Sequence, residues 1–142
     1  MTDAHFQLAQ IYARMGRYVE AVESYRQAAR IDPKHFDSTF QLGVCYQSMT
    51  RHEDAVDALR KALTLRAEEP EALARLGASF TALDRHQDAA DAFERAVRAR
   101  PDRAESHHQL GLAYRRLRRP ESAIRSLQDA TRLQPKIGRA HV

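Results

Sequence analysis

The residues of this chain that could do chemistry are seven histidines, one cysteine and a run of arginines. A metal site needs clustered ligands, and two histidines on one helix form such a cluster when they lie four residues apart. No histidine here has a partner at that spacing, although His52 and His86 are 34 residues apart. We therefore expect packed or solvated histidines and no metal site.

Cys45 is the only cysteine, so an internal disulfide cannot form. It lies among small residues next to Tyr46, which favours a small core residue over a nucleophile. The sequence has no glycine-rich loop that could cradle a phosphate and no grouping of serine, histidine and aspartate. We expect no catalysis by this chain itself and no cofactor.

Five arginines lie within residues 114–125, YRRLRRPESAIR. Residues 103–136 hold eight Lys or Arg but only three Asp or Glu, so the net charge of +4 is unevenly distributed. Such a patch attracts acidic partners or phosphates. Aromatic rings that could stack on bases are not interleaved with the arginines. We interpret the run as the polar face of a helix pair that favours an acidic protein partner, and we do not expect nucleic-acid binding.

The composition favours an all-α protein. Apolar residues make up 43% of the chain and charged residues 30%, and five glycines with five prolines leave little room for the turns of an all-β fold. No apolar run approaches the length of a membrane span, and the first residues lack the order of a secretory signal. We therefore expect a cytoplasmic protein without membrane association.

One pattern recurs every 34 residues, which is typical of stacked supersecondary units. Each unit reads as two helices, because apolar residues follow a helical spacing that breaks near the middle of the unit. The glycines of the pattern should let the second helix approach the first closely. The recurring positions are Leu8-Ala9, Leu42-Gly43, Leu76-Gly77 and Leu110-Gly111; Tyr12, Tyr46, Phe80 and Tyr114; and Ala28, Ala62, Ala96 and Ala130.

These motifs resemble the tetratricopeptide repeat (TPR) family over residues 2–135. The resemblance implies an all-α solenoid of antiparallel helix hairpins, stacked in a right-handed superhelix whose concave groove is lined by the first helix of each repeat. The tryptophan that is frequent in the family is absent, and its positions hold His5, Thr39, Leu73 and His107, which should weaken packing between helices. The expected repeats span residues 2–35, 36–69, 70–103 and 104–135.

The resemblance also implies which residues face the groove. Apolar groups clustered on a surface usually mark a contact site, so we expect Phe6 and Phe40 to be exposed anchors. Some family members clamp the carboxylate end of chaperone tails, but of the matching positions only Arg75 agrees and Glu71 would repel a carboxylate, so that activity is not expected. The predicted groove residues are Phe6, Gln10, Phe40, Gln41, Val44, Gln47, Arg75, His108, Leu112 and Arg115.

The predicted function is a protein-interaction scaffold that binds a peptide or protein segment in this groove. The alternative is an accessory repeat region of a larger enzyme, such as a glycosyltransferase or a kinase. Sequence outside residues 1–135 would distinguish the two.

Residues 137–142, IGRAHV, resemble a translated sequencing adapter, because the adapter bases ATC GGA AGA GCA CAC GTC TGA encode these residues and a stop. We expect residues 136–142 to be a non-native tail on a fragment of a larger protein. Helical arrays usually finish with a polar cap. We therefore expect parts of the face carrying Leu110, Tyr114, Leu117 and Ile124 to be exposed, and the chain to self-associate or fray at its fourth repeat.

Overall fold

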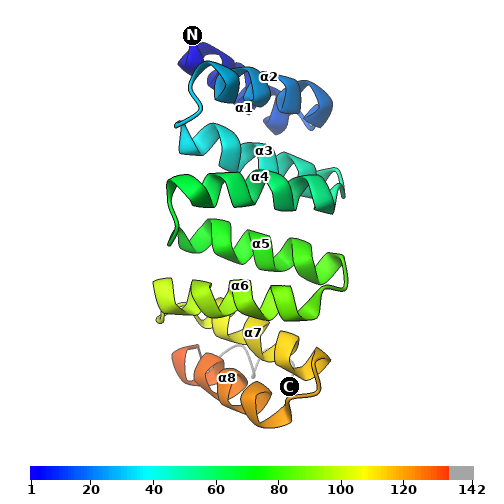
Figure 1. The fold of residues 1–142 in the computed structure, drawn as a ribbon, viewed down its shortest axis with the longest axis vertical. Helices are drawn as coiled ribbons and strands as arrows, with labels where there is room; N and C mark the ends of the chain where they lie inside the picture. The colour runs from blue at the N-terminus through cyan, green and yellow to red at the C-terminus, as the bar shows by residue number, and fades with distance from the viewer. Residues whose placement is uncertain (135–142) are drawn as a thin grey trace. The chain divides into compact units, whose positions relative to one another are not determined.

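The computed structural model describes residues 1–134, which form eight α-helices and no strand (Figure 1). The predicted all-α fold is confirmed, whereas the predicted non-native tail lies outside the described residues. Contacts divide the chain into two units, residues 1–67 and residues 68–142. The first unit holds α1 (Thr2–Arg14), α2 (Tyr18–Ile31), α3 (Phe36–Ser48) and α4 (His52–Leu65). The second holds α5 (Pro70–Ala82), α6 (His86–Ala99), α7 (Ala104–Arg116) and α8 (Pro120–Leu133).

Each unit consists of two helix hairpins packed on each other. In the first unit α1 pairs with α2 and α3 with α4, and α2 packs on α3. In the second unit α5 pairs with α6 and α7 with α8, and α6 packs on α7. A single hairpin cannot bury its apolar stripe alone, so the neighbouring hairpin completes the core.

The same turn closes every hairpin. The backbone N–H of Arg17 donates to the carbonyl of Tyr12 at 2.9 Å, and the equivalent bonds follow α3, α5 and α7 at 2.8–2.9 Å. Such a bond spans a residue in the left-handed region, where glycine is the usual choice. Gly16 fills this position in the first repeat with a φ of 75°. The other three turns place Thr50, Asp84 and Arg118 there, at φ of 57–58°.

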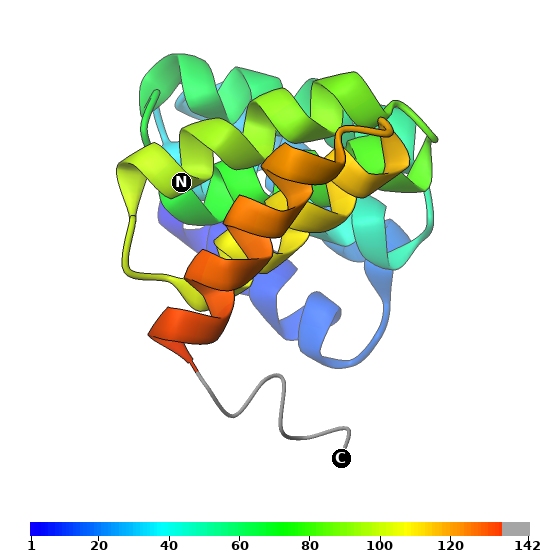
Figure 2. The same ribbon diagram turned by 90° about the horizontal axis from the view of Figure 1, so that it is seen from below.

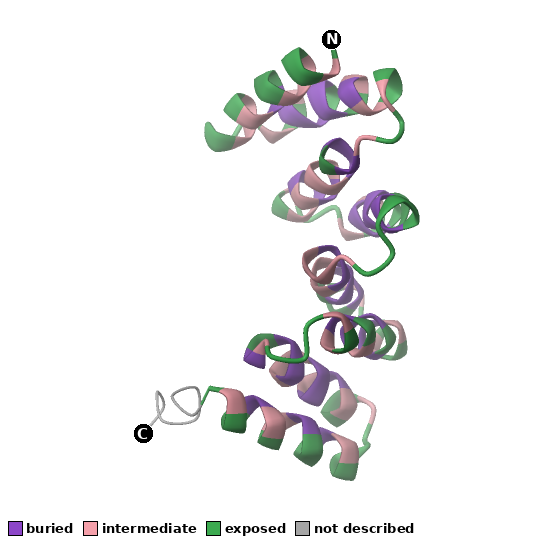
Figure 3. Cartoon of the chain, turned by 90° about the vertical axis from the view of Figure 1, so that its left-hand side faces the viewer, coloured by how far each residue is buried: buried purple, intermediate pink, exposed green. Residues whose placement is uncertain are grey.

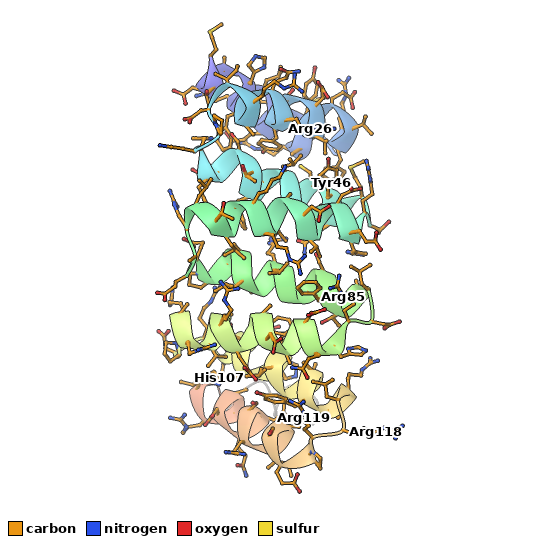
Figure 4. The ribbon with its side chains drawn as sticks, viewed as in Figure 1. Arg26, Tyr46, Arg85, His107, Arg118 and Arg119 are labelled. Carbon is orange, nitrogen blue, oxygen red and sulfur yellow. The ribbon has the colours of Figure 1, made fainter. Side chains whose placement is uncertain are left out.

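In three repeats, the arginine that follows the left-handed residue contacts both helices that the turn connects. The guanidinium of Arg17 lies 4.9 Å from the ring centroid of Tyr12, and the corresponding distances for Arg51 over Tyr46 and Arg85 over Phe80 are 5.0 Å and 4.8 Å. These arginines also form ion pairs with Glu20, Asp54 and Asp88 one turn into the following helix. Because the pairs are largely exposed, the Coulomb energy of each is small, and their main role is to orient the turn. Figure 4 labels Tyr46 and Arg85 at two of these turns.

The fourth repeat is more covered than we expected. Leu110 is buried, and Tyr114 and Leu117 are half-buried, so the expected exposure is wrong for these three residues. The reason is that α7 packs against α6, where the Tyr114 hydroxyl donates to the carboxylate of Glu94. Only Ile124 of the predicted set is exposed, at 55%.

Replacing Thr50 with glycine should stabilise the chain. A β-branched residue is disfavoured at positive φ by about 1–2 kcal/mol, and the entropy of glycine offsets part of the gain. We expect the free energy of unfolding in urea to rise by about 0.5–1 kcal/mol. Lys61→Gly, at an exposed position inside α4, is the control and should lower it by about 1 kcal/mol. If both variants lose stability equally, the turn does not constrain Thr50 as described.

Candidate functional site

A hollow of about 320 Å³ lies between α1, α2 and α3 in the first unit. We call it the α1–α3 hollow. Helix α1 contributes residues one turn apart, α2 contributes two tyrosines, and α3 contributes residues on its matching face. The lining residues are Gln10, Ala13, Arg14, Tyr18, Tyr25, Gln41, Val44, Cys45 and Ser48.

The floor of the α1–α3 hollow is formed by Tyr25 and Cys45, which are 1% and 3% exposed. Burial raises the pKa of Tyr25 to about 12, with a smaller contribution from nearby Cys45. Burial also raises the pKa of the Cys45 thiol to about 11. Both groups are therefore neutral at pH 7, and Cys45 is not a thiolate nucleophile, because a reactive cysteine needs a lowered pKa.

The rim of the hollow is polar and carries one charge. Gln10 and Gln41 are half-buried, whereas Arg14 and Ser48 are exposed. Arg14 is the only charged residue among the nine that line the hollow. Amides both donate and accept hydrogen bonds, whereas a guanidinium only donates. The arrangement can thus hold a polar backbone and an anionic group above a neutral floor.

The structure brings three predicted groove residues, Gln10, Gln41 and Val44, together in this hollow. The expectation that Phe6 and Phe40 are exposed is wrong, because both are half-buried. The Phe6 ring packs against Tyr25 at 5.6 Å and against His35 at 5.1 Å between centroids. The Phe40 ring stacks on Phe36 at 5.5 Å. Gln47, also predicted, is half-buried on α3 and is not a lining residue.

The other predicted residues lie in the second unit. His108 and Leu112 are half-buried on α7, and Arg115 is exposed at its end. Arg75 on α5 forms an ion pair with Glu71 at 3.2 Å, and Glu71 also lies 3.5 Å from Arg103. Part of the charge of Arg75 is therefore balanced within the chain.

Three rim residues, Arg14, Tyr18 and Ser48, are absent from the predicted set. Arg14 follows Gln10 by four residues, and Ser48 follows Val44 by four, so each continues a predicted helical face by one turn. Extending the face by that turn would have found both. Tyr18 begins α2 and had no comparable signal, because its place depends on how the hairpin closes.

The arginine run surrounds the turn between α7 and α8, where Figure 4 labels Arg118 and Arg119. Arg115, Arg116 and Arg118 are exposed, and Arg119 donates to the side-chain carbonyl of Gln87 on α6 at 3.0 Å. One hydrogen bond from Arg119 thus attaches the cluster to α6, and the exposed guanidinium groups beside it carry positive charge.

Within residues 1–134, no three His, Cys, Asp or Glu side chains come together in a way that could hold a metal ion. His107 is buried and its Nε2 lies 2.8 Å from the carbonyl oxygen of Pro101, which gives this histidine a packing role. In the same described part of the chain, every helix is too short or too polar to cross a lipid bilayer.

Comparison with known proteins identifies the repeat. A family model described as tetratricopeptide repeat matches residues 2–68 and 69–136. A search of curated proteins finds no match. A crystal structure of MamA shares 22% identity, with a TM-score of 0.90 over 97% of this chain and 81% of that one.

Two further solved structures show the same fold. The MamA RS-1 ArsTM double mutant is 27% identical, with a TM-score of 0.89 over 94% of this chain and 75% of that one. MamA 41-end from Desulfovibrio magneticus RS-1 is 18% identical, with a TM-score of 0.87 over 96% and 77% of the two chains.

The Cys45 thiol should be protected from reagents in the folded chain. With a pKa of about 11 instead of 9, the thiolate fraction near pH 8 falls about 100-fold, so Ellman's reagent should react about 100-fold more slowly than in urea. Because the folded pKa is raised, the related stability is present below pH 9 and lost as the pH rises toward 11. Cys45→Ser gives the background rate, and equal rates for folded and unfolded protein would contradict the buried position.

Proposed function

The chain belongs to the tetratricopeptide repeat family, and on this basis we propose that it binds a segment of another protein in the α1–α3 hollow. Helical repeat arrays generally present extended binding surfaces. The observation that carries the proposal is the meeting of Gln10, Gln41 and Val44 from two first helices over a buried floor. The chain acts as an interaction scaffold and performs no catalysis of its own.

The size of the hollow suits side chains of a bound segment. At about 320 Å³ it lies at the small end of ligand pockets, which span about 300–1,000 Å³. Val44 and Ala13 offer apolar contact, so a short apolar side chain of the partner fits between them. The segment would enter with one such residue as its anchor.

Polar groups at the rim would orient the segment. The amides of Gln10 and Gln41 can hydrogen-bond a peptide backbone, which has one donor and one acceptor per residue. Arg14 favours a carboxylate near the anchor, since no acidic residue lines the hollow to neutralise it. The preferred partner is therefore an extended segment that places an acidic residue close to a small apolar one.

A selection of random twelve-residue peptides displayed on phage, followed by calorimetry, tests this proposal. Val44→Asp should weaken the selected peptides roughly 5- to 100-fold, as expected for loss of an anchor contact. Arg14→Glu should weaken peptides with an acidic residue most, and its effect should shrink as salt increases. Ala78→Asp is the matched control, because Ala78 is the exposed equivalent of Val44 on α5.

The control decides where the peptides bind. Unchanged affinity in Ala78→Asp, together with the loss in Val44→Asp, supports the α1–α3 hollow. Equal losses in both variants, or none in Val44→Asp, would place binding elsewhere and refute this site.

A further inference from the structure

Two helix faces at opposite ends of the sequence are apolar and open to solvent. On α1, Leu8, Ile11 and Met15 are 43%, 55% and 61% exposed. On α8, Ile124 is 55% exposed and borders a hollow of about 490 Å³ that Leu127 also lines. Figure 2 shows α8 with α7 beside it, and Figure 3 shows exposed residues along the side of α8 that faces away from α7.

The same faces are buried in the other repeats. Ile124 is equivalent, by steps of 34 residues, to Val22 on α2 and Ala90 on α6, and both of these are buried. Those two helices are the ones that pack on α3 and α7. The open face of α8 therefore corresponds to the face through which α2 and α6 each pack on the following helix.

The open face of α1 corresponds to the opposite side of the same helix–helix contact. Ile11 is equivalent to Cys45 on α3 and Ala113 on α7, which are 3% and 5% exposed. Since α3 packs on α2 and α7 packs on α6, the chain already uses this face to receive a preceding helix. The exposed faces of α8 and α1 thus match the two sides of one helix–helix contact, and a second copy of the chain can supply the missing side of each.

The polar contacts between α6 and α7 also have counterparts on α8 of one copy and at α1 of the next. There, Arg119 donates to Gln87, and the Tyr114 hydroxyl donates to Glu94. The repeat spacing puts Glu121 of α8 where Gln87 is and Arg17 where Arg119 is. The hydrogen bond from a charged guanidinium to a neutral amide inside the chain would therefore become a pair of opposite charges between copies, which favours the contact.

The second polar contact keeps its tyrosine donor, while its acceptor changes from a carboxylate to a neutral amide. Gln128 of α8 takes the place of Glu94, and Tyr12 takes the place of Tyr114. A tyrosine hydroxyl can donate to the side-chain carbonyl of a glutamine. Arg17 already pairs with Glu20 at 2.6 Å, but a guanidinium has five N–H donors and can serve both carboxylates.

We propose that copies of this chain associate head to tail, with α8 of one copy packing on α1 of the next. The two faces differ, so the contact is heterologous and each dimer keeps one free face of each kind. Association therefore continues beyond the dimer unless it closes into a ring. Exposed apolar patches of this kind usually mark such interaction sites.

Sedimentation velocity of the full chain over a range of concentrations tests the proposal. The wild-type chain should form species larger than a dimer as its concentration rises. Ile11→Glu and Ile124→Glu should each be monomeric, because a buried unpaired carboxylate opposes the contact. Ile31→Glu is the matched control, since Ile31 is exposed at 48% on α2 and lies on neither face, and it should associate like the wild type.

Mixing the two monomeric variants gives the sharpest result. The Ile11→Glu chain keeps an intact α8 face and the Ile124→Glu chain keeps an intact α1 face, so an equimolar mixture should form a one-to-one dimer and nothing larger. A mixture that stays monomeric would overturn the proposal. So would association that Ile124→Glu abolishes and Ile11→Glu leaves intact, because that pattern indicates α8 packing on another α8.

A charge reversal keeps the test independent of the apolar variants. Glu121→Arg should weaken association several-fold by placing like charges opposite Arg17, whose own contacts with Tyr12 and Glu20 stay intact. Glu121→Gln should retain association, because it reproduces the contact of Gln87 with Arg119. A Glu121→Arg chain that associates like the wild type, or a wild-type chain that is monomeric at every concentration, would overturn the proposal.

Discussion

The structure depends on how closely the two helices of each hairpin approach. A Cβ atom added to Gly77 would lie 2.6 Å from the ring of Phe93, and one added to Gly43 would lie 2.8 Å from Leu59. Real Cβ contacts are not this short, so these positions hold glycine because the partner side chain occupies the space. The close approach fixes the hairpins that hold glycine at this position, whereas α1 holds the fully buried Ala9 there. The hairpins in turn set the α1–α3 hollow and the faces through which one hairpin packs on the next.

Much of the fold could be predicted because the 34-residue repeat is visible in the sequence. The Leu-Gly pairs and the alanines at 34-residue intervals indicate helix hairpins with close contact, as observed. The turns could be placed but the geometry of two of them could not, because threonine and arginine do not suggest positive φ. At Thr50 the bond from the Arg51 N–H to the Tyr46 carbonyl outweighs the local preference of the residue.

The candidate site was less predictable, since it depends on contacts between helices. Helical spacing and family resemblance place Gln10, Gln41 and Val44 on one predicted groove face, and all three line the α1–α3 hollow. Phe6 is covered by residues of α2 and of the loop before α3, which no single-helix pattern reveals. The stacking of Phe40 on Phe36 is different, because a spacing of four residues on one helix could have predicted it.

The most direct test of this account is the stability of Gly77→Ala, measured by urea unfolding. Helix propensity alone would raise the free energy of unfolding by about 1 kcal/mol. The crowding against Phe93 should instead lower it by about 1–3 kcal/mol, because an overpacked core forces side chains out of place. In a Phe93→Ala background, where the ring is gone, the same change should become neutral or stabilising. A Gly77→Ala chain that is more stable than the wild type would contradict the claim that close helix approach governs the fold.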